Sequence, residues 1–216
     1  MQSFLIFVVA LACFQSIDCR KLQPLSCDDI RQFVNGHNLR REQIAKGEIS
    51  GQPAATQMKY MIWDKELAAK AAKWASSDND FHNPDRSIAS ERFSTGENLH
   101  WYMTSNKNHK INPDSALESW FNEHENYKFA PLKSSDFQKT GKKQIAHYTQ
   151  MVWSDSDRVG CAIGTSRTAQ MKSFFVVCNY GPAGNYLGNI PYKSGEPSNR
   201  LICGVGDCSK PYGDQC

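Results

Sequence analysis

The fold of this chain is decided by two segments, AHYTQMVW at residues 146–153 and FVVCNYGPAGNY at residues 175–186. Both combine aromatic residues with Gly, Pro, Cys or His, which are residue types that a sequence uses sparingly. Such residues serve either as buried scaffold or as carriers of chemistry. We expect Trp153, Tyr180 and Cys178 to be scaffold and His147 to reach a polar cleft.

The length and composition are those of one globular domain with a short appendage. The chain has 216 residues, of which 40% are hydrophobic and 22% are charged, with a formal net charge of +3. Lys and Arg are spread along the chain and form no basic cluster, so the charge gives no argument for nucleic acid as a partner. We expect a monomer.

The N-terminal residues 1–19 are predicted to be a signal peptide. Their apolar run, residues 4–14, has 11 residues and is too short to cross a bilayer. Cleavage after Cys19 fits the pattern, and cleavage after Ala12 is an open alternative. No other apolar run approaches membrane length. We therefore expect a secreted, extracellular protein with no membrane span.

Six cysteines remain once residues 1–19 are removed, at positions 27, 161, 178, 203, 208 and 216. An even number of cysteines in an exported chain predicts three disulfides, and the sequence alone leaves 15 pairings open. No C-x-x-C pair exists, which argues against zinc-ribbon and thioredoxin folds.

Local patterns predict three helices and one hairpin. A helix is expected after Ser26, a second after the N-cap residue Asp64, and a third after Asn112, where Pro follows. Two β-rich runs, residues 159–164 and 173–178, are separated by a turn and predict an antiparallel hairpin. Helices mixed with an antiparallel hairpin favour the α+β class.

The two opening segments resemble the signature motifs of the CAP superfamily, which comprises cysteine-rich secretory proteins, venom antigen-5 proteins and plant pathogenesis-related-1 proteins. The GEN stretch at 96–98 and the WFNE stretch at 120–123 agree with further family motifs, and one departure is Ala146, where the family usually has Gly. The resemblance covers residues 27–192 and implies a three-layer α-β-α sandwich. Residues 193–216 would then form a short, disulfide-stabilised extension.

The resemblance implies a central cleft that holds two His and two Glu. Carried over by motif, they are His82, Glu97, Glu123 on the third helix, and His147. Two neutral imidazoles can bind Zn²⁺ with water in the remaining positions, so His82 and His147 are the candidate metal ligands. The alternative is a hydrogen-bonded network that holds the cleft together. We expect no required cofactor.

The resemblance also implies a disulfide between Cys161 and Cys178, which lie on the two arms of the predicted hairpin. Many relatives have a further disulfide, and both of its cysteines are replaced in this chain, by Thr95 and Gly181. The other four cysteines would form two bridges, one of which ties the N-terminal helix to the tail.

Relatives bind apolar ligands, either sterols through a loop after the third helix or fatty acids between helices. The matching loop here is residues 127–145, and its third aromatic, Phe137, comes later than the sterol-loop spacing. We interpret the aromatic residues of this loop as anchors of the loop itself.

The tail places Val205, Gly206 and Asp207 between two cysteines. A short closed loop with an exposed Asp can present a carboxylate to the metal site of an integrin, and the alternative is an ordinary turn. Channel-blocking relatives end in a large cysteine-dense domain, whereas 14 residues run from Cys203 to the last position here. An ion-channel target would therefore have to be reached through the core surface.

The leading hypothesis is a non-enzymatic secreted protein that binds an apolar lipid or a protein partner, as venom-allergen-like proteins do. The first alternative is an integrin-directed or channel-directed effector. The second is a metal-dependent hydrolase, since two His and two Glu resemble a catalytic set. No Ser or Cys nucleophile has a motif context, which favours a non-enzymatic protein.

Overall fold

The computed structural model describes residues 20–138, 143–214 and 216. The expected signal peptide, residues 1–19, lies outside the described residues. No helix in the described part of the chain combines the length and the hydropathy that crossing a bilayer requires.

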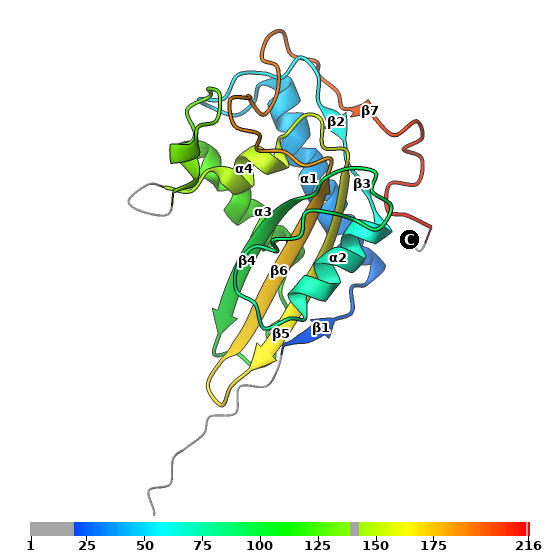
Figure 1. The fold of residues 1–216 in the computed structure, drawn as a ribbon, viewed down its shortest axis with the longest axis vertical. Helices are drawn as coiled ribbons and strands as arrows, with labels where there is room; N and C mark the ends of the chain where they lie inside the picture. The colour runs from blue at the N-terminus through cyan, green and yellow to red at the C-terminus, as the bar shows by residue number, and fades with distance from the viewer. Residues whose placement is uncertain (1–19, 139–142, 215) are drawn as a thin grey trace, which may run out of the picture.

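A five-stranded sheet forms the middle layer of the molecule (Figure 1). Four strands follow the order β1-β5-β6-β4, and β3 pairs in parallel with β5. These strands are β1 (Lys21–Gln23), β3 (Ile62–Trp63), β4 (Gly96–Thr104), β5 (Arg158–Arg167) and β6 (Lys172–Gly181). β4 is an edge strand and pairs antiparallel with β6 over its nine residues.

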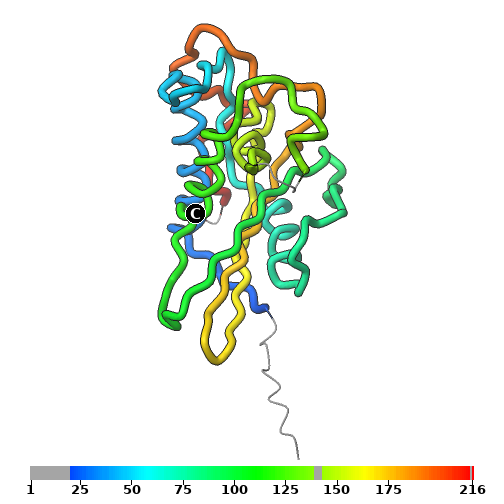
Figure 2. The backbone as a smooth tube through the Cα atoms, turned by 90° about the vertical axis from the view of Figure 1, so that its left-hand side faces the viewer, coloured from blue at the N-terminus to red at the C-terminus, as the bar shows by residue number. Residues whose placement is uncertain are grey.

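Helices cover both faces of this sheet (Figure 2). One face packs against α1 (Cys27–Lys46), α3 (Pro113–Phe121) and α4 (Ala146–Met151), and the other packs against α2 (Lys65–Ala75). Two 3₁₀ turns, η1 (Asn122–Asn126) and η2 (Ser134–Phe137), follow α3. The expected α+β class and the three-layer α-β-α sandwich are confirmed.

The three long helices begin where their capping residues predict. Ser26 and Asp29 form a capping box at α1. The Asp64 side chain accepts hydrogen bonds from the first turn of α2, and Asn112 does the same for α3, where Pro113 is the first helical residue. Local capping chemistry therefore fixes the helix starts.

Buried Arg41 joins α1 to the end of α4. Its side chain is fully buried and donates hydrogen bonds of 2.8–3.2 Å to five backbone carbonyls, those of Lys59, Met151, Trp153, Ser154 and Ser156. Burial lowers the pKa of Arg41 to about 9. The guanidinium thus joins α1 to β2 (Lys59–Tyr60) and to the end of α4 and the turn that follows it, and these hydrogen bonds fix the position of α4.

Three disulfides pin the sheet and the tail. Cys161–Cys178 joins facing residues of β5 and β6. Cys27–Cys216 ties the start of α1 to the tail, as expected, and Cys203–Cys208 closes a short loop. The tail also pairs through β7 (Ile202–Cys203) with β2 (Lys59–Tyr60) in a parallel ladder.

The hairpin is confirmed and is longer than predicted, because β5 and β6 each have ten residues. β4 and α4 were not among the predicted elements. The reason for β4 is that its first half buries polar residues, so it lacks the alternation that marks a strand.

Candidate functional site

Two His–Glu pairs form the polar site. His82 Nδ1 lies 2.8 Å from Glu97 Oε1, and His147 Nδ1 lies 2.6 Å from Glu123 Oε1. In both pairs Nδ1 meets the carboxylate, and no described residue bonds to Nε2 of either ring. The structure therefore brings the four residues together as two pairs.

The His147 pair is built on the junction between α3 and α4. Glu123 was expected on the third helix, and this placement is wrong. α3 ends at Phe121, and Glu123 lies in the 3₁₀ turn that follows it. Glu123 Oε2 accepts hydrogen bonds from the backbone N–H groups of His147 (3.0 Å) and Tyr148 (3.2 Å). A carboxylate at the first turn of α4 satisfies free N–H groups there, and so it also fixes the ring of His147.

The His82 pair is built on β4 and the loop before it. The Glu97 side chain is fully buried, whereas the His82 side chain is 48% exposed. Glu97 also accepts hydrogen bonds from the backbone N–H of Asn83 (2.9 Å) and from Asn179 Nδ2 (3.3 Å). Three donors on one buried carboxylate make Glu97 the fixed member of this pair and His82 the open one.

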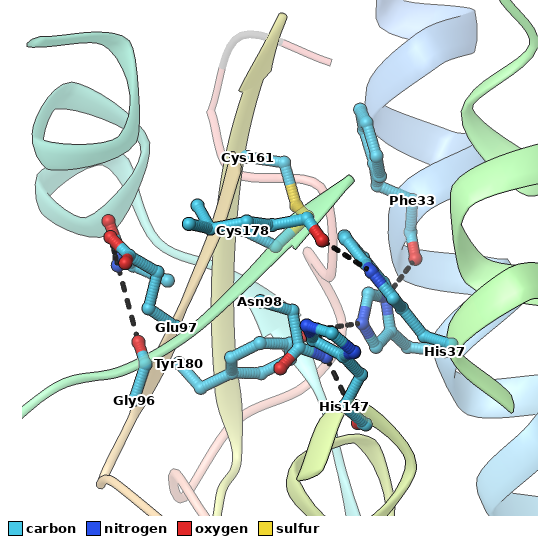
Figure 3. The surroundings of a disulfide bond; sticks show 12 residues. Phe33, His37, Gly96, Glu97, Asn98, His147, Cys161, Cys178 and Tyr180 are labelled. Carbon is cyan, nitrogen blue, oxygen red and sulfur yellow. Dashed lines mark hydrogen bonds between the residues drawn. A yellow bond between two sulfur atoms is a disulfide. The ribbon is translucent and has the colours of Figure 1, made fainter. Parts of the chain in front are cut away.

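The neighbouring β4 residues Glu97 and Asn98 point to opposite faces of the sheet. Asn98 points toward the α1 face, where its Nδ2 donates to His147 O (3.0 Å) and Tyr180 Oη (3.1 Å). Its neighbour Glu97 faces Asn179 across the sheet, on the side covered by α2. Figure 3 shows Glu97 and His147 on either side of Asn98.

Comparison with known proteins identifies the family. The model of the cysteine-rich secretory protein family, CAP, matches residues 34–180. The chain belongs to the CAP family. The predicted resemblance is thereby confirmed, and the chain is of the venom-allergen-like type.

Its relatives include venom allergen 5 of Rhynchium brunneum, which is 37% identical over 76% of this chain and 72% of that protein. The cysteine-rich secretory protein LCCL domain-containing 2 of Homo sapiens is 31% identical over 88% of this chain, which spans 35% of the length of that protein. The crystal structure of NaASP2 with Zn²⁺ superposes with a TM-score of 0.65 at 30% identity and covers 81% of this chain and 90% of that one.

The donor set of this CAP domain fits a water-completed metal site better than a closed one. In the described residues no group of three or more His, Cys, Asp or Glu lies close enough to hold a metal ion. The rings of His82 and His147 nevertheless have the arrangement of metal-ligating histidines, with Nδ1 on a carboxylate and Nε2 free. Any metal ion bound here would be coordinated by few protein side chains.

A buried hydrogen-bond chain behind His147 was not predicted. The His37 ring donates from Nδ1 to Phe33 O (2.7 Å), and Tyr180 Oη donates to His37 Nε2 (2.9 Å) while it accepts from Asn98. Burial lowers the pKa of His37 to about 3, so the ring is neutral at physiological pH. This chain links α1 to the β4 residue that holds the His147 carbonyl.

A third histidine, His100, lies on the same side of β4 as His147. The Trp120 ring lies between them, with its centroid 6.3 Å from the His100 ring and 6.1 Å from the His147 ring. Burial and the nearby His147 lower the pKa of His100. Trp120 Nε1 also donates to Leu99 O (3.0 Å), which closes the edge of β4 at this point.

The first aromatic residues of the loop after α3 are anchors. Tyr127 is buried, donates from Oη to Ala130 O (2.6 Å) and packs against Phe129 and Tyr148. Phe129 packs on Tyr192 with a centroid distance of 4.8 Å. These rings hold the first part of the loop against the core.

A shallow, open groove lies along α1 beside the start of α3. It has a volume of about 630 Å³ and is lined by Asp28, Arg31, Gln32, Asn35, Gly36, Leu39 and Asp114. Leu39 is 58% exposed there. A Cβ at Gly36 would collide with Leu117, so Gly36 permits the close approach of the two helices.

The tail loop presents its Asp. Cys203–Cys208 closes a six-residue ring in which Gly206 has φ +86° and Asp207 is exposed. Hydrogen bonds from the backbone N–H and the hydroxyl of Ser209 lower the pKa of Asp207. The loop is thus a covalently closed turn with an ionised carboxylate.

Proposed function

We propose that this CAP protein is secreted and acts outside the cell as a non-enzymatic binding protein, with the groove between α1 and α3 as the site of an apolar chain. The observation that carries this proposal is the exposed Leu39 in a groove of about 630 Å³. Exposed apolar area in a hollow is stabilised by an apolar ligand that removes it from water.

The ends of the groove select a ligand with one anionic head. Arg40 is paired with Asp114 at 2.7 Å, so that cation is already neutralised. Arg31 lies 3.2 Å from Asp28 in an exposed pair and also donates to Cys216 O (3.3 Å). Exposed contacts of this kind contribute little, so a ligand carboxylate can replace Asp28 as a partner of the guanidinium. A fatty acid would place its chain on Leu39 and its carboxylate on Arg31.

Native mass spectrometry of the secreted protein, followed by titration with oleate, tests this proposal. Leu39→Asp should abolish oleate binding, and Arg31→Gln should weaken it several-fold. Leu187→Asp is the matched control, because Leu187 is also 58% exposed and lies outside the groove. Equal oleate affinity of the wild type and Leu39→Asp would refute the groove.

In the part of the chain that the structure describes, neither His82 nor His147 is hydrogen-bonded to a Ser or Cys side chain, which supports a non-enzymatic role over the hydrolase alternative. All six described cysteines are in disulfides, and Ser156 Oγ is buried and donates to Pro182 O (2.7 Å), away from either His. Each His is engaged by a Glu instead. Peptidase activity that is lost in His147→Ala would contradict this interpretation.

A second candidate function is binding of an integrin through Val205, Gly206 and Asp207. The exposed carboxylate in a disulfide-closed loop favours it, because a divalent cation with an open position accepts such an oxygen. Asp207→Ala should abolish binding to an immobilised integrin ectodomain in Mn²⁺, with Asp155→Ala as an exposed acidic control. Unchanged binding of the Asp207 variant would exclude the loop.

A third proposal concerns Zn²⁺ at His82 and His147. It is supported by the free Nε2 atoms and by the Zn²⁺ in the crystal structure of NaASP2. When bound, the metal would add a Lewis acid to the cleft, while Glu97 and Glu123 orient the two rings. Calorimetric titration of the wild type with Zn²⁺ should show one binding site, and His82→Ala and His147→Ala should each remove it. Equal heats of binding in the wild type and both variants would refute the proposed site.

A further inference from the structure

At the end of β4 away from the His–Glu pairs lies a surface that we call the sheet tip, residues 101–111 and 165–173. Figures 1 and 2 both show the β4–α3 connection beside the β5–β6 turn. Two contacts join them: Lys107 Nζ donates to Thr168 O (2.7 Å), and Lys172 Nζ donates to His109 O (2.6 Å). Residues about 60 apart in sequence thus form one surface.

The sheet tip is positively charged. Its two segments contain four cationic residues, Lys107, Lys110, Arg167 and Lys172, and no Asp or Glu. Burial, Arg167 and Lys110 together lower the pKa of Lys172, which places these cations within electrostatic reach of one another. Unpaired charges of one sign on a small surface attract an anionic partner.

The same surface exposes three consecutive apolar or aromatic residues. Trp101, Tyr102 and Met103 are 46%, 38% and 59% exposed. Trp101 stacks on Phe175 at 5.0 Å, and Tyr102 packs against His109 at 5.1 Å. Because successive strand residues point to opposite faces, these side chains surround the end of the edge strand from both sides.

We propose that the sheet tip binds the surface of a membrane that contains anionic lipids. Trp and Tyr side chains prefer the membrane–water interface, and Lys or Arg around them are attracted to anionic headgroups. The charge favours an anionic partner, and the exposed Met103 adds an apolar side chain that gains from insertion between lipids. A purely polyanionic partner would use the cations alone.

The exposed apolar residues of the sheet tip lie far from the His–Glu pairs. Met103 lies six residues along β4 from Glu97, about 20 Å at the rise of a strand. Membrane contact at the tip therefore leaves the His–Glu pairs open. The proposal does not rest on an apolar ligand in that groove.

Vesicle co-sedimentation tests the electrostatic part. The protein should bind vesicles of phosphatidylcholine mixed with phosphatidylserine, bind phosphatidylcholine alone much more weakly, and lose binding at high salt. Lys110→Glu combined with Arg167→Glu should weaken binding roughly tenfold or more, since each cation near an anionic surface contributes about fivefold. Lys73→Glu combined with Lys193→Glu, both exposed elsewhere, is the control with equal net charge.

Quenching by brominated lipids tests the insertion. Trp101 is 46% exposed, whereas Trp63, Trp120 and Trp153 are at most 8% exposed. The fifth Trp, Trp74, is partly buried on α2, outside the sheet tip, so Trp101 should be the residue that lipid bromine quenches. Trp101→Phe should remove the quenching while the protein still sediments with vesicles. Met103→Ser should weaken vesicle binding several-fold, and Leu187→Ser, which removes an equally exposed apolar residue, should leave it unchanged.

Three results would overturn the proposal. The first is equal binding to vesicles with and without phosphatidylserine. The second is loss of binding in the charge variant with no effect of Met103→Ser and no quenching of Trp101, which would assign the surface to a soluble polyanion such as heparin. The third is a dimer in solution that Met103→Ser dissociates, which would mean that a second copy covers the edge of β4.

Discussion

The two halves of β4 belong to one strand and have opposite environments. Residues 97–99 are at most 8% exposed, and their polar groups bond to α3, to α4 and to the neighbouring strand β6. Residues 101–103 are 38–59% exposed. This difference indicates that the buried half stabilises the site, whereas the open half is free to contact a partner. Substitutions that disturb the buried half should therefore lower the free energy of unfolding, whereas substitutions in the open half should not.

Acid should produce the largest effect, because the buried half depends on neutral His37. Its pKa is about 3 in the folded state and about 6.5 when exposed, so the unfolded state binds more protons between these values. The free energy of unfolding should therefore fall as pH falls, by about 3 kcal/mol from this residue between pH 7 and pH 4. Urea unfolding at the two pH values measures the loss.

The matched comparison is between His37→Gln and His109→Gln, the latter at the sheet tip. His37→Gln should flatten the pH dependence of unfolding, since the group that titrates is gone. His109→Gln should leave that dependence as it is in the wild type. The same slope in all three proteins would show that carboxylates alone cause the acid loss.

Gly96→Ala should produce the next largest effect. An added Cβ would collide with the side chain of Gln150, which is held by hydrogen bonds to Gly184 N (2.9 Å) and Ser156 Oγ (3.1 Å). Overpacking of this kind costs about 2 kcal/mol. Met103→Ala in the open half should change stability by less than about 0.5 kcal/mol. Denaturant midpoints compare the two, and equal midpoints would break the contrast between the halves.

Tyr180→Phe should have a smaller effect of about 1.5 kcal/mol, because it removes the hydroxyl between His37 and Asn98. His37 Nε2 then has no partner, and Asn98 Nδ2 keeps only its bond to His147 O. Tyr102→Phe is the matched change in the open half and should cost nothing measurable. Thermal unfolding of the pair checks this. Equal melting temperatures for the wild type and Tyr180→Phe would mean that the buried chain contributes no stability.

Neutralising the sheet tip should have the smallest effect and the opposite sign. Arg167→Gln combined with Lys110→Gln removes like charges near Lys172 and should raise the free energy of unfolding by a few tenths of a kcal/mol at low salt. The gain should vanish at 1 M salt, where exposed charges are screened over about 3 Å. A loss of stability would show that these cations have structural partners.

The contrast also explains which features the sequence predicted. Helix starts were predictable because Ser26, Asp64 and Asn112 cap their own helices, within three residues along the chain. β4 was not, since its alternation is masked by Glu97 and Asn98, which are buried by contacts with distant segments.

The features of the candidate site also divide into those that local motifs predict and those that depend on distant segments. Motifs placed His82, Glu97, Glu123 and His147 together, and the structure adds that they form two His–Glu pairs. The link from His37 through Tyr180 spans 143 residues, and no local pattern carries it. The sheet tip could likewise not be predicted from the sequence, because its cations are spread along the chain and only the hairpin brings them together.

The bond between Cys27 and Cys216 has a consequence for proteolysis. It joins residues 189 positions apart, so a single cut anywhere between them leaves both fragments covalently attached. The nicked chain would run as one band on a non-reducing gel and as two after reduction. A protease that opens one loop would therefore leave the surfaces on both sides of the cut tethered to each other.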